Sequence, residues 1–254
     1  MVRLLSAGAT DLGLRRGNNE DAYLAMPELG FFAIADGMGG EAAGETASRY
    51  FIETAQAAFR SEVPSSEETN YALVQKVFSC SNKRIFEHAE QNPDDHGMGC
   101  TGDLLAFYRD RYVIGHVGDS RVYLLRDGSL RQLTRDHSLV QLQVDRGMLT
   151  PEEARNHPRK NILLRALGTD PAVSFDMLEG SGLNGDIFLL CSDGLTDMVD
   201  DAAIQDTLVS TETISQKVKS LIGTALSAGG RDNITVILCE VQMNGAVESS
   251  SGAA

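Results

Sequence analysis

Short apolar runs, each bounded by turn residues, are the feature that most restricts the fold of this chain. Six of them recur along the sequence, at residues 31–35, 104–107, 112–115, 122–125, 187–190 and 234–238. Turn residues separate neighbouring runs at 109–111 and 126–128, which predicts β-strands joined by tight hairpins. All six runs are far shorter than the ~20 apolar residues that a membrane helix needs, so we expect no membrane span.

Longer segments carry apolar residues at helical rather than strand spacing. Residues 41–60 and 71–88 repeat apolar positions in steps of three and four, and Pro64 lies between them. A third amphipathic pattern runs over residues 214–225. Strand runs followed by helix runs predict an α+β fold, in which the sheets are largely antiparallel and the helices pack outside them.

Charge and cysteine usage narrow the functional classes. The chain has 254 residues and a net charge of -14 at pH 7. This acidity argues against nucleic-acid binding, which depends on Lys and Arg contacts to phosphate, and against docking on anionic lipid. The four cysteines form no CxxC pair, and the first residues lack the apolar core of a signal peptide. We therefore expect a cytoplasmic protein with reduced thiols.

The chain is predicted to form one domain followed by a tail. Residues 1–243 contain no internal repeat and no stretch with the composition of a linker. Residues 244–254 are mostly small or polar and carry no hydrophobic pattern. We predict that this last segment is disordered, because it has little apolar surface to bury.

Five aspartates stand beside the predicted strands. Asp36, Asp119 and Asp193 each follow a strand, and Asp21 and Asp232 each precede one. A lone carboxylate at a buried strand end is unfavourable, and neighbouring glycines let backbone carbonyls approach a ligand closely. Mg2+ and Mn2+ take oxygen ligands of this kind. An Asp-Gly pair is also a common turn, so the pattern alone leaves open whether these acids form one metal site.

Six sequence blocks surround these aspartates in a fixed order. They are RGNNED at 16–21, ADGMGG at 35–40, GHVGDSR at 115–121, LTRDHS at 133–138, CSDGL at 191–195 and GRDNIT at 230–235. Together they resemble the metal-dependent serine/threonine protein phosphatases (PPM, or protein phosphatase 2C) in their short bacterial form. The resemblance covers about residues 7–241. It implies a four-layer α/β/β/α sandwich, with two antiparallel sheets flanked by helices and a metal centre at one edge.

The resemblance also implies roles for individual acids. Asp36 would bridge two metal ions, and the Gly37 carbonyl would bind one of them. Asp193 and Asp232 would bind the other ion. We therefore expect Asp36, Asp193 and Asp232 to be the catalytic residues.

Four further positions take roles from the same resemblance. Glu20 and Asp21 would bind a metal ion or orient its waters, and Asp119 would hold a third ion together with Asp193. Arg16 would bind the substrate phosphate, because a guanidinium stays charged and can contact two phosphate oxygens at once. The preceding arginine is the alternative for this last role.

The implied activity is hydrolysis of phosphoserine and phosphothreonine in proteins, in opposition to a bacterial Ser/Thr kinase. Two or three Mn2+ or Mg2+ ions would lower the pKa of a bridging water. The resulting hydroxide would attack phosphorus directly, without a phosphoenzyme. The implied partners are phosphoprotein substrates and a cognate kinase, and we expect a monomer.

The chain departs from the family pattern at several points. Met38 stands where eukaryotic members carry a His proposed as general acid, so the leaving-group proton must come from elsewhere. Cys100 stands where a threonine is usual, and we expect local repacking there.

The polar segment Asp145–Asn161, here called the flap, resembles a mobile flap of the family; an ordinary surface helix and loop is the alternative. His116 and His137 are predicted to be structural hydrogen-bonding residues near the site.

Two rival functions fit the sequence less well. A phosphatase with an aspartyl nucleophile needs an Asp-x-Asp pair after a strand, and Asp36-Gly37-Met38 lacks it. A pseudophosphatase that only binds partners would have lost at least one metal aspartate, and none is missing. A phosphatase of partner-switching regulators differs from the main hypothesis only in its substrate, which the sequence does not distinguish.

Overall fold

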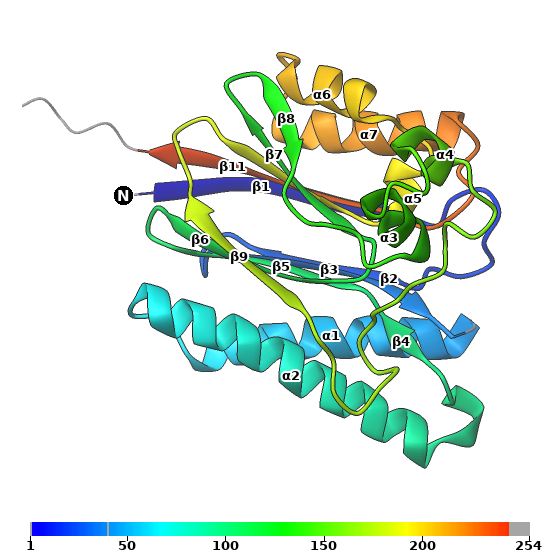
Figure 1. Cartoon of the computed structure of the whole chain (residues 1–254). Coiled ribbons are helices and arrows are strands. Elements are labelled where there is room, and N and C mark those ends of the chain that lie inside the picture. Colours follow the sequence, from blue (N-terminus) through cyan, green and yellow to red (C-terminus); the bar gives the residue numbers. More distant parts are fainter. Residues whose placement is uncertain (1, 40, 244–254) are drawn as a thin grey trace, which may run out of the picture.

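The protein is built of four layers, as the resemblance implied (Figure 1). The computed structural model describes residues 2–39 and 41–243. Two antiparallel sheets face each other in the middle, and helices cover the outer face of each sheet. The predicted tail at 244–254 lies outside the described residues.

Strands that are distant in sequence lie side by side in both sheets. The first sheet has the order β1 (Val2–Asp11), β11 (Ile234–Met243), β10 (Ile187–Cys191), β7 (Arg121–Arg126) and β8 (Ser129–Gln132). The second has the order β2 (Asp21–Met26), β3 (Phe31–Met38), β5 (Gly102–Tyr108), β6 (Arg111–Val117) and β9 (Asp176–Ser181), and β4 (Gly99–Cys100) also pairs with β3. Each of the six apolar runs lies within one of these strands.

Two tight hairpins confirm the predicted turns. Tyr108 pairs with Arg111 across the turn between β5 and β6, and the turn residue Arg109 has a φ of 58°. The β7–β8 hairpin turns at Asp127 and Gly128, which have φ values of 51° and 75°. A positive φ at the first central residue of each turn matches the right-handed twist of paired strands, so these short loops set the register of both hairpins.

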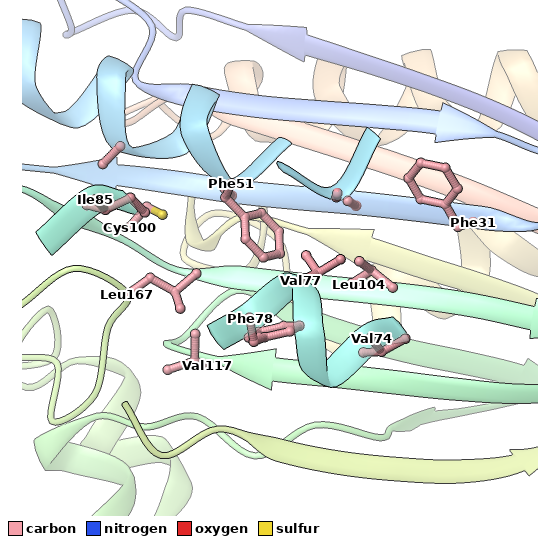
Figure 2. Packing of buried hydrophobic residues seen from close by; sticks show 14 of the residues in the cluster. Phe31, Phe51, Val74, Val77, Phe78, Ile85, Cys100, Leu104, Val117 and Leu167 are labelled. Atoms are coloured by element: carbon pink, nitrogen blue, oxygen red, sulfur yellow. The ribbon is translucent and has the colours of Figure 1, made fainter. Parts of the chain in front are cut away.

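The apolar runs are continuous because the central strands are buried on both faces. In β3, Phe31 and Ala33 point toward the helices, whereas Phe32 and Ile34 point into the space between the two sheets. Figure 2 shows the first of these layers, where Phe51 of one helix meets Phe78 of the next, with ring centroids 5.3 Å apart. Side chains that alternate between two buried faces make every position of the strand apolar.

Four longer helices cover the two sheets. Helices α1 (Glu41–Ser61) and α2 (Glu67–Gln91) pack on the second sheet, and α6 (Asp201–Val209) and α7 (Ile214–Ser227) pack on the first. Helix α2 begins four residues before the predicted pattern because Ser66 caps it. The Ser66 hydroxyl accepts the Thr69 N–H at 3.2 Å, and the Thr69 hydroxyl accepts the Ser66 N–H at 2.9 Å.

Short elements occupy the edge of the sandwich where the sequence becomes polar. Helices α3 (Leu139–Asp145) and α4 (Pro151–Arg155) form in and beside the flap, α5 (Asp193–Thr196) follows β10, and a 3-10 turn spans Pro93–Asp95. Among residues 2–39 and 41–243, no helix is both long and apolar enough to span a bilayer.

Candidate metal centre

Strand pairing in the second sheet brings two aspartates together at one edge. Asp21 begins β2, Asp36 lies near the end of β3, and the two are direct cross-strand neighbours. The Gly37 N–H donates to the Glu20 carbonyl at 3.1 Å, which extends this pairing by one step. Two acids that are 15 positions apart in the sequence are therefore fixed side by side by the β2–β3 register.

Three more acids lie at the same edge. They come from the first sheet and from the connection between the two sheets. Asp193 starts α5 directly after β10, and Asp232 precedes β11. Asp119 lies in the short connection between β6 of one sheet and β7 of the other. A cavity of about 230 Å³ opens at this edge, lined by Arg16, Glu20, Asp36, Gly37, Met38, Gly39, Thr101, Asp119, Asn161, Leu163, Asp193 and Asp232. Seven of the eight site residues named from the sequence thus line one cavity.

Asp21, the eighth residue, lies behind the cavity wall. Its carboxylate Oδ2 accepts hydroxyl hydrogen bonds from Thr235 at 2.6 Å and from Ser192 at 2.8 Å. Its Oδ1 is buried and accepts no hydrogen bond from the described residues. Asp21 is therefore anchored through one oxygen, while the other remains available for a further ligand.

Three glycines, which have no side chain, let the backbone and the acidic residues pack closely around the cavity. A Cβ at Gly37 would collide with the Gly44 carbonyl of α1, and one at Gly44 would collide with the Glu20 carboxylate. A Cβ at Gly194 would collide with the Asn233 carbonyl, next to Asp232. The glycines of the DG pairs were visible in the sequence, whereas the need for Gly44 appears only once α1 is packed on β3.

Burial and mutual repulsion disfavour the ionised form of the clustered acids. Burial raises the pKa of Asp36 well above its usual value, and the charges of Asp21 and Asp193 raise it further. The pKa of Asp193 is raised in the same way, by burial first and then by the charges of Asp119 and Asp197. Burial and the charge of a neighbouring aspartate raise the pKa of Asp119 to about 7. A bound divalent cation would offset this repulsion.

The residues present fit a hard divalent cation. Like Asp21, Asp193 has a buried carboxylate oxygen, Oδ1, that accepts no hydrogen bond from the described residues. Buried charge without a partner is unfavourable, and oxygen ligands suit Mg2+ and Mn2+. Among the described residues, no three acidic, His or Cys side chains already form a ligand set for one ion. Backbone carbonyls and waters would complete each site, as is usual for Mg2+.

Asp232 and Arg16 contact each other at the mouth of the cavity. Arg16 Nη2 lies 2.6 Å from Asp232 Oδ2, and the Arg16 side chain is 49% exposed. This hydrogen bond raises the pKa of Arg16. The Arg16 loop is held against the site because the Leu14 N–H donates to the Gly230 carbonyl at 2.7 Å. A guanidinium in this position can meet a phosphate that enters from solvent.

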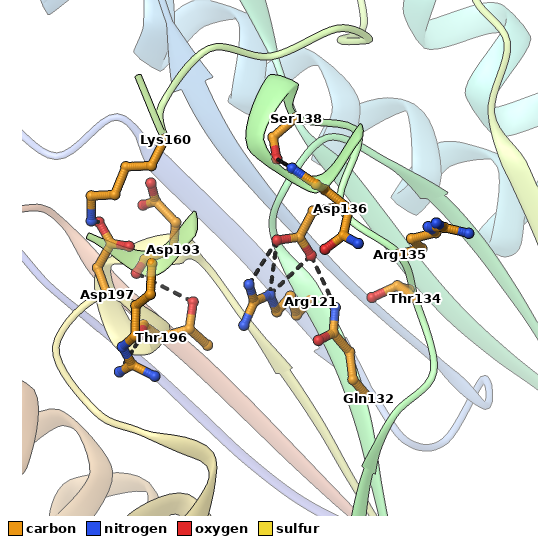
Figure 3. A network of polar contacts seen from close by, with 12 residues as sticks. Arg121, Gln132, Thr134, Arg135, Asp136, Ser138, Lys160, Asp193, Thr196 and Asp197 are labelled. Carbon is orange, nitrogen blue, oxygen red and sulfur yellow. Dashed lines mark hydrogen bonds and ion pairs between the residues drawn. The ribbon is translucent and has the colours of Figure 1, made fainter. Parts of the chain in front are cut away.

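A second cavity lies beside the first, between the core and the short helices α3 and α4. Its volume is about 280 Å³, and Asp119, Asn161 and Asp193 line both cavities. Figure 3 shows its charged side chains, among them Lys160 of the flap, which forms an ion pair with Asp197 at the end of α5. The flap therefore contacts the core beside the clustered acids.

The two histidines named from the sequence are structural, as predicted. His116 is fully buried, its Nδ1 lies 2.8 Å from Asp103 Oδ1, and its Nε2 lies 2.9 Å from the Arg135 carbonyl. His137 accepts the Gly118 N–H through Nδ1 at 3.3 Å. His137 thus supports the connection that carries Asp119, and His116 ties β6 to β5 and to the Arg135 backbone beside it.

Sequence reasoning missed the polar residues that hold the acids in place. Asn233 accepts the Glu20 N–H at 2.9 Å and donates to the carbonyls of Leu12 and Asn18 at 2.9 and 3.0 Å. Its position directly after Asp232, inside a sequence block, was the available signal. It joins the β1–β2 loop to the start of β11, and so ties together two segments that line the cavity.

Comparison with known proteins identifies the family. A model described as protein phosphatase 2C matches residues 15–229. The chain belongs to the protein phosphatase 2C family. It is 42% identical over 236 residues to the serine/threonine phosphatase stp of Listeria monocytogenes (serovar 1/2a, strain EGD-e), covering 91% of this chain and 93% of that one.

Two mycobacterial comparisons extend the family assignment. The serine/threonine protein phosphatase PstP of Mycobacterium tuberculosis (strain H37Rv) is 42% identical over 236 residues, which are 92% of this chain. This chain spans 44% of the length of that relative. A solved structure of the PstP catalytic domain, in complex with two manganese ions, superposes with a TM-score of 0.88 at 38% identity, covering 96% of this chain and 100% of that one.

Proposed function

We propose that this member of the protein phosphatase 2C family hydrolyses phosphoserine and phosphothreonine in proteins, using divalent metal ions held by its clustered acids. The observation that carries the proposal is one cavity lined by carboxylates from both sheets, beside which Asp21 and Asp193 each have a buried oxygen that accepts no hydrogen bond from the described residues. The names of the relatives support the choice of substrate class. The manganese ions in the PstP domain support the choice of metal.

The residues of the cavity can be divided between two principal ion sites and a third. We assign Asp36 as the bridge between the two principal ions, with the Gly37 carbonyl on one of them. Asp193 and Asp232 belong to the other ion. This division uses the β2–β3 pairing on one side of the cavity and the β10–β11 edge on the other. Mn2+ or Mg2+ would satisfy oxygen ligands of this kind.

The remaining acids stand around this pair of sites. Glu20 and Asp21 lie where they can bind an ion or orient its waters, and Asp21 is held in place by two hydroxyl groups. Asp119 lies between the two cavities, close enough to Asp193 for their charges to interact. We assign Asp119 and Asp193 to a third ion.

The bound cations and the protein side chains would each supply part of the chemistry. Divalent ions, when bound, supply an activated water near neutral pH and offset the negative charge of the phosphate. Arg16 binds the phosphate at the mouth of the cavity, where its guanidinium can leave Asp232 and contact two phosphate oxygens. Met38 also lines the cavity and has no proton to donate, so the leaving group takes its proton from another source.

The described cysteines do not favour a thiolate nucleophile. Cys100, Cys191 and Cys239 are buried, and burial raises the pKa of all three thiols, whereas the exposed Cys80 lies on α2 and lines neither cavity beside the clustered acids. A nucleophilic cysteine instead needs a lowered pKa and access to substrate. Direct attack by water, without a covalent phosphoenzyme, is therefore the reaction that this site supports best.

We also infer the cellular setting. Phosphoproteins are the substrates, and a Ser/Thr kinase that makes them is the partner whose action this phosphatase reverses. We propose a cytoplasmic, monomeric enzyme that acts in signalling, in keeping with a net charge of -14, which disfavours contact with nucleic acid and anionic lipid.

Hydrolysis of p-nitrophenyl phosphate and of a phosphothreonine peptide tests the proposal. Each substrate is assayed with Mn2+, with Mg2+ and with EDTA. We expect hydrolysis of both substrates with at least one of the metals and loss of activity in EDTA. Undiminished activity in EDTA would contradict the metal mechanism, and hydrolysis of the small ester alone would contradict the protein substrate.

A further inference from the structure

One rung of the second sheet is built differently from its neighbours, beside Asp36. Cross-strand pairs at Ile34–Asp103 and Gly37–Cys100 place Thr101 opposite Asp36. The Thr101 N–H donates to the Asp36 carbonyl at 2.8 Å, as in an ordinary antiparallel rung. The Asp36 N–H instead donates to the Thr101 hydroxyl oxygen at 2.9 Å. In an ordinary rung both acceptors are backbone carbonyls, so here a side chain replaces one of them.

The first sheet contains the same arrangement beside Asp193. The Ser192 N–H donates to the Thr235 carbonyl at 3.1 Å, and the Thr235 N–H donates to the Ser192 hydroxyl at 3.0 Å. This rung follows directly on the Cys191–Val236 pair. A hydroxyl thus replaces a backbone carbonyl at the end of one ladder in each sheet, next to a clustered aspartate.

The Thr101 hydroxyl makes a second contact that the backbone could not make. Thr101 Oγ1 lies 2.7 Å from Ser120 Oγ, and both residues are almost fully buried. Ser120 directly follows Asp119. A hydroxyl has one proton and two lone pairs, so Thr101 can accept from the Asp36 N–H and still bond to Ser120. One side chain therefore joins the strand end that carries Asp36 to the connection that carries Asp119.

The neighbouring Cys100 shows why a hydroxyl is needed at position 101 and not at position 100. Cys100 pairs with Leu167 through the backbone alone, with its N–H donating at 3.1 Å and its carbonyl accepting at 2.9 Å. Its side chain is fully buried in the apolar layer beneath α1 and α2. A thiol suits these apolar surroundings, and the repacking expected from the sequence stays a prediction.

We propose that Thr101 is a positioning residue whose hydroxyl sets the separation of the Asp36 and Asp119 carboxylates and so tunes the affinity for divalent metal. This role rests on the metal centre proposed above. Thr101 acts through the backbone of Asp36 and through Ser120, and it has no part in the chemical step. Residues that orient metal ligands commonly change affinity or activity about 10- to 100-fold when they are replaced.

The variants Thr101→Val, Thr101→Ser and Thr134→Val test this role. Valine keeps the shape of threonine and removes the hydroxyl, whereas serine keeps the hydroxyl. Thr134→Val is the matched control, because the buried Thr134 hydroxyl also accepts a backbone N–H, that of Val122 at 3.0 Å, and Thr134 does not line the cavity of the clustered acids. Both valine variants therefore lose the same kind of hydrogen bond, and only one of them loses it beside an aspartate.

Calorimetric titration with Mn2+ alone gives a readout that does not depend on turnover, and half-saturating Mn2+ in the phosphatase assay gives a second one. We expect Thr101→Val to weaken Mn2+ binding by about tenfold or more, with Thr101→Ser and Thr134→Val close to wild type. Equal Mn2+ affinity in Thr101→Val and Thr134→Val would overturn the proposed role, as would a serine variant as weak as the valine variant. A wild-type chain that binds no Mn2+ would overturn the metal centre itself.

Discussion

Replacing Asp119 by asparagine should stabilise the metal-free protein. The gain in the free energy of unfolding follows from the raised pKa of Asp119. Burial, and then the charge of Asp136, raise the pKa of Asp119 from 3.8 to about 7. That shift is about three units, and one unit corresponds to about 1.4 kcal/mol. Ionised Asp119 therefore lowers the free energy of unfolding by at most about 4 kcal/mol at pH above 7. Asparagine has a similar shape and carries no charge.

The sign of the pH dependence follows from the raised pKa. A group whose pKa is higher in the folded state stabilises the fold fully below its unfolded pKa, and this contribution is lost as the pH rises through the folded value. The advantage of Asp119→Asn over wild type should therefore be small near pH 4, grow through pH 5 to 7, and be largest near pH 8.

Urea unfolding in EDTA, at several pH values between pH 4 and pH 8, measures this difference. Asp206→Asn is the matched control, because Asp206 is exposed on α6, and it should show no comparable gain. A gain for Asp119→Asn that is absent at pH 8, or that is the same at every pH, would refute the electrostatic account of the cluster.

Three further changes test other parts of the structure. Arg16→Ala should lower kcat/KM for a phosphothreonine peptide by about 10- to 100-fold, because a hydrogen bond to a charged group contributes about 1.5–3 kcal/mol; equal loss in the control Arg15→Ala would contradict the choice of arginine. Lys160→Met removes a partly exposed ion pair and should change the free energy of unfolding by less than about 1 kcal/mol. It should nevertheless speed chymotryptic cleavage within the flap. Unchanged cleavage would show that the pair does not hold the flap. Phe78→Ala empties the layer beneath α2 and should lower the free energy of unfolding, measured with urea, by about 3–5 kcal/mol; a loss below about 1 kcal/mol would contradict the packing described for this layer.

The strands could be predicted from the sequence because local patterns specify them. Each apolar run is buried on both faces, and each hairpin has turn residues that accept a positive φ. The aspartates could be placed at strand ends for the same reason. That they converge followed from the resemblance to a family, since no local pattern states which strand ends share an edge.

The supporting contacts could not be predicted because they depend on long-range register. The bond from the Asp36 N–H to Thr101 spans 65 positions of sequence, and the bond from Thr235 to Asp21 spans 214. A threonine or serine beside an aspartate looks like an ordinary loop residue in the sequence. Only the assembled sheets show that these hydroxyls replace backbone acceptors or bind carboxylates.

Mn2+ binding by wild type and by Asp193→Asn, measured calorimetrically beside the control Asp206→Asn, tests the central claim most directly. The account predicts that wild type and Asp206→Asn bind at least two Mn2+ ions per chain, as the related PstP domain does. It predicts that Asp193→Asn loses ions and, with them, hydrolysis of the phosphothreonine peptide. Full Mn2+ binding and full activity in Asp193→Asn would contradict the assignment of these clustered acids as the metal centre.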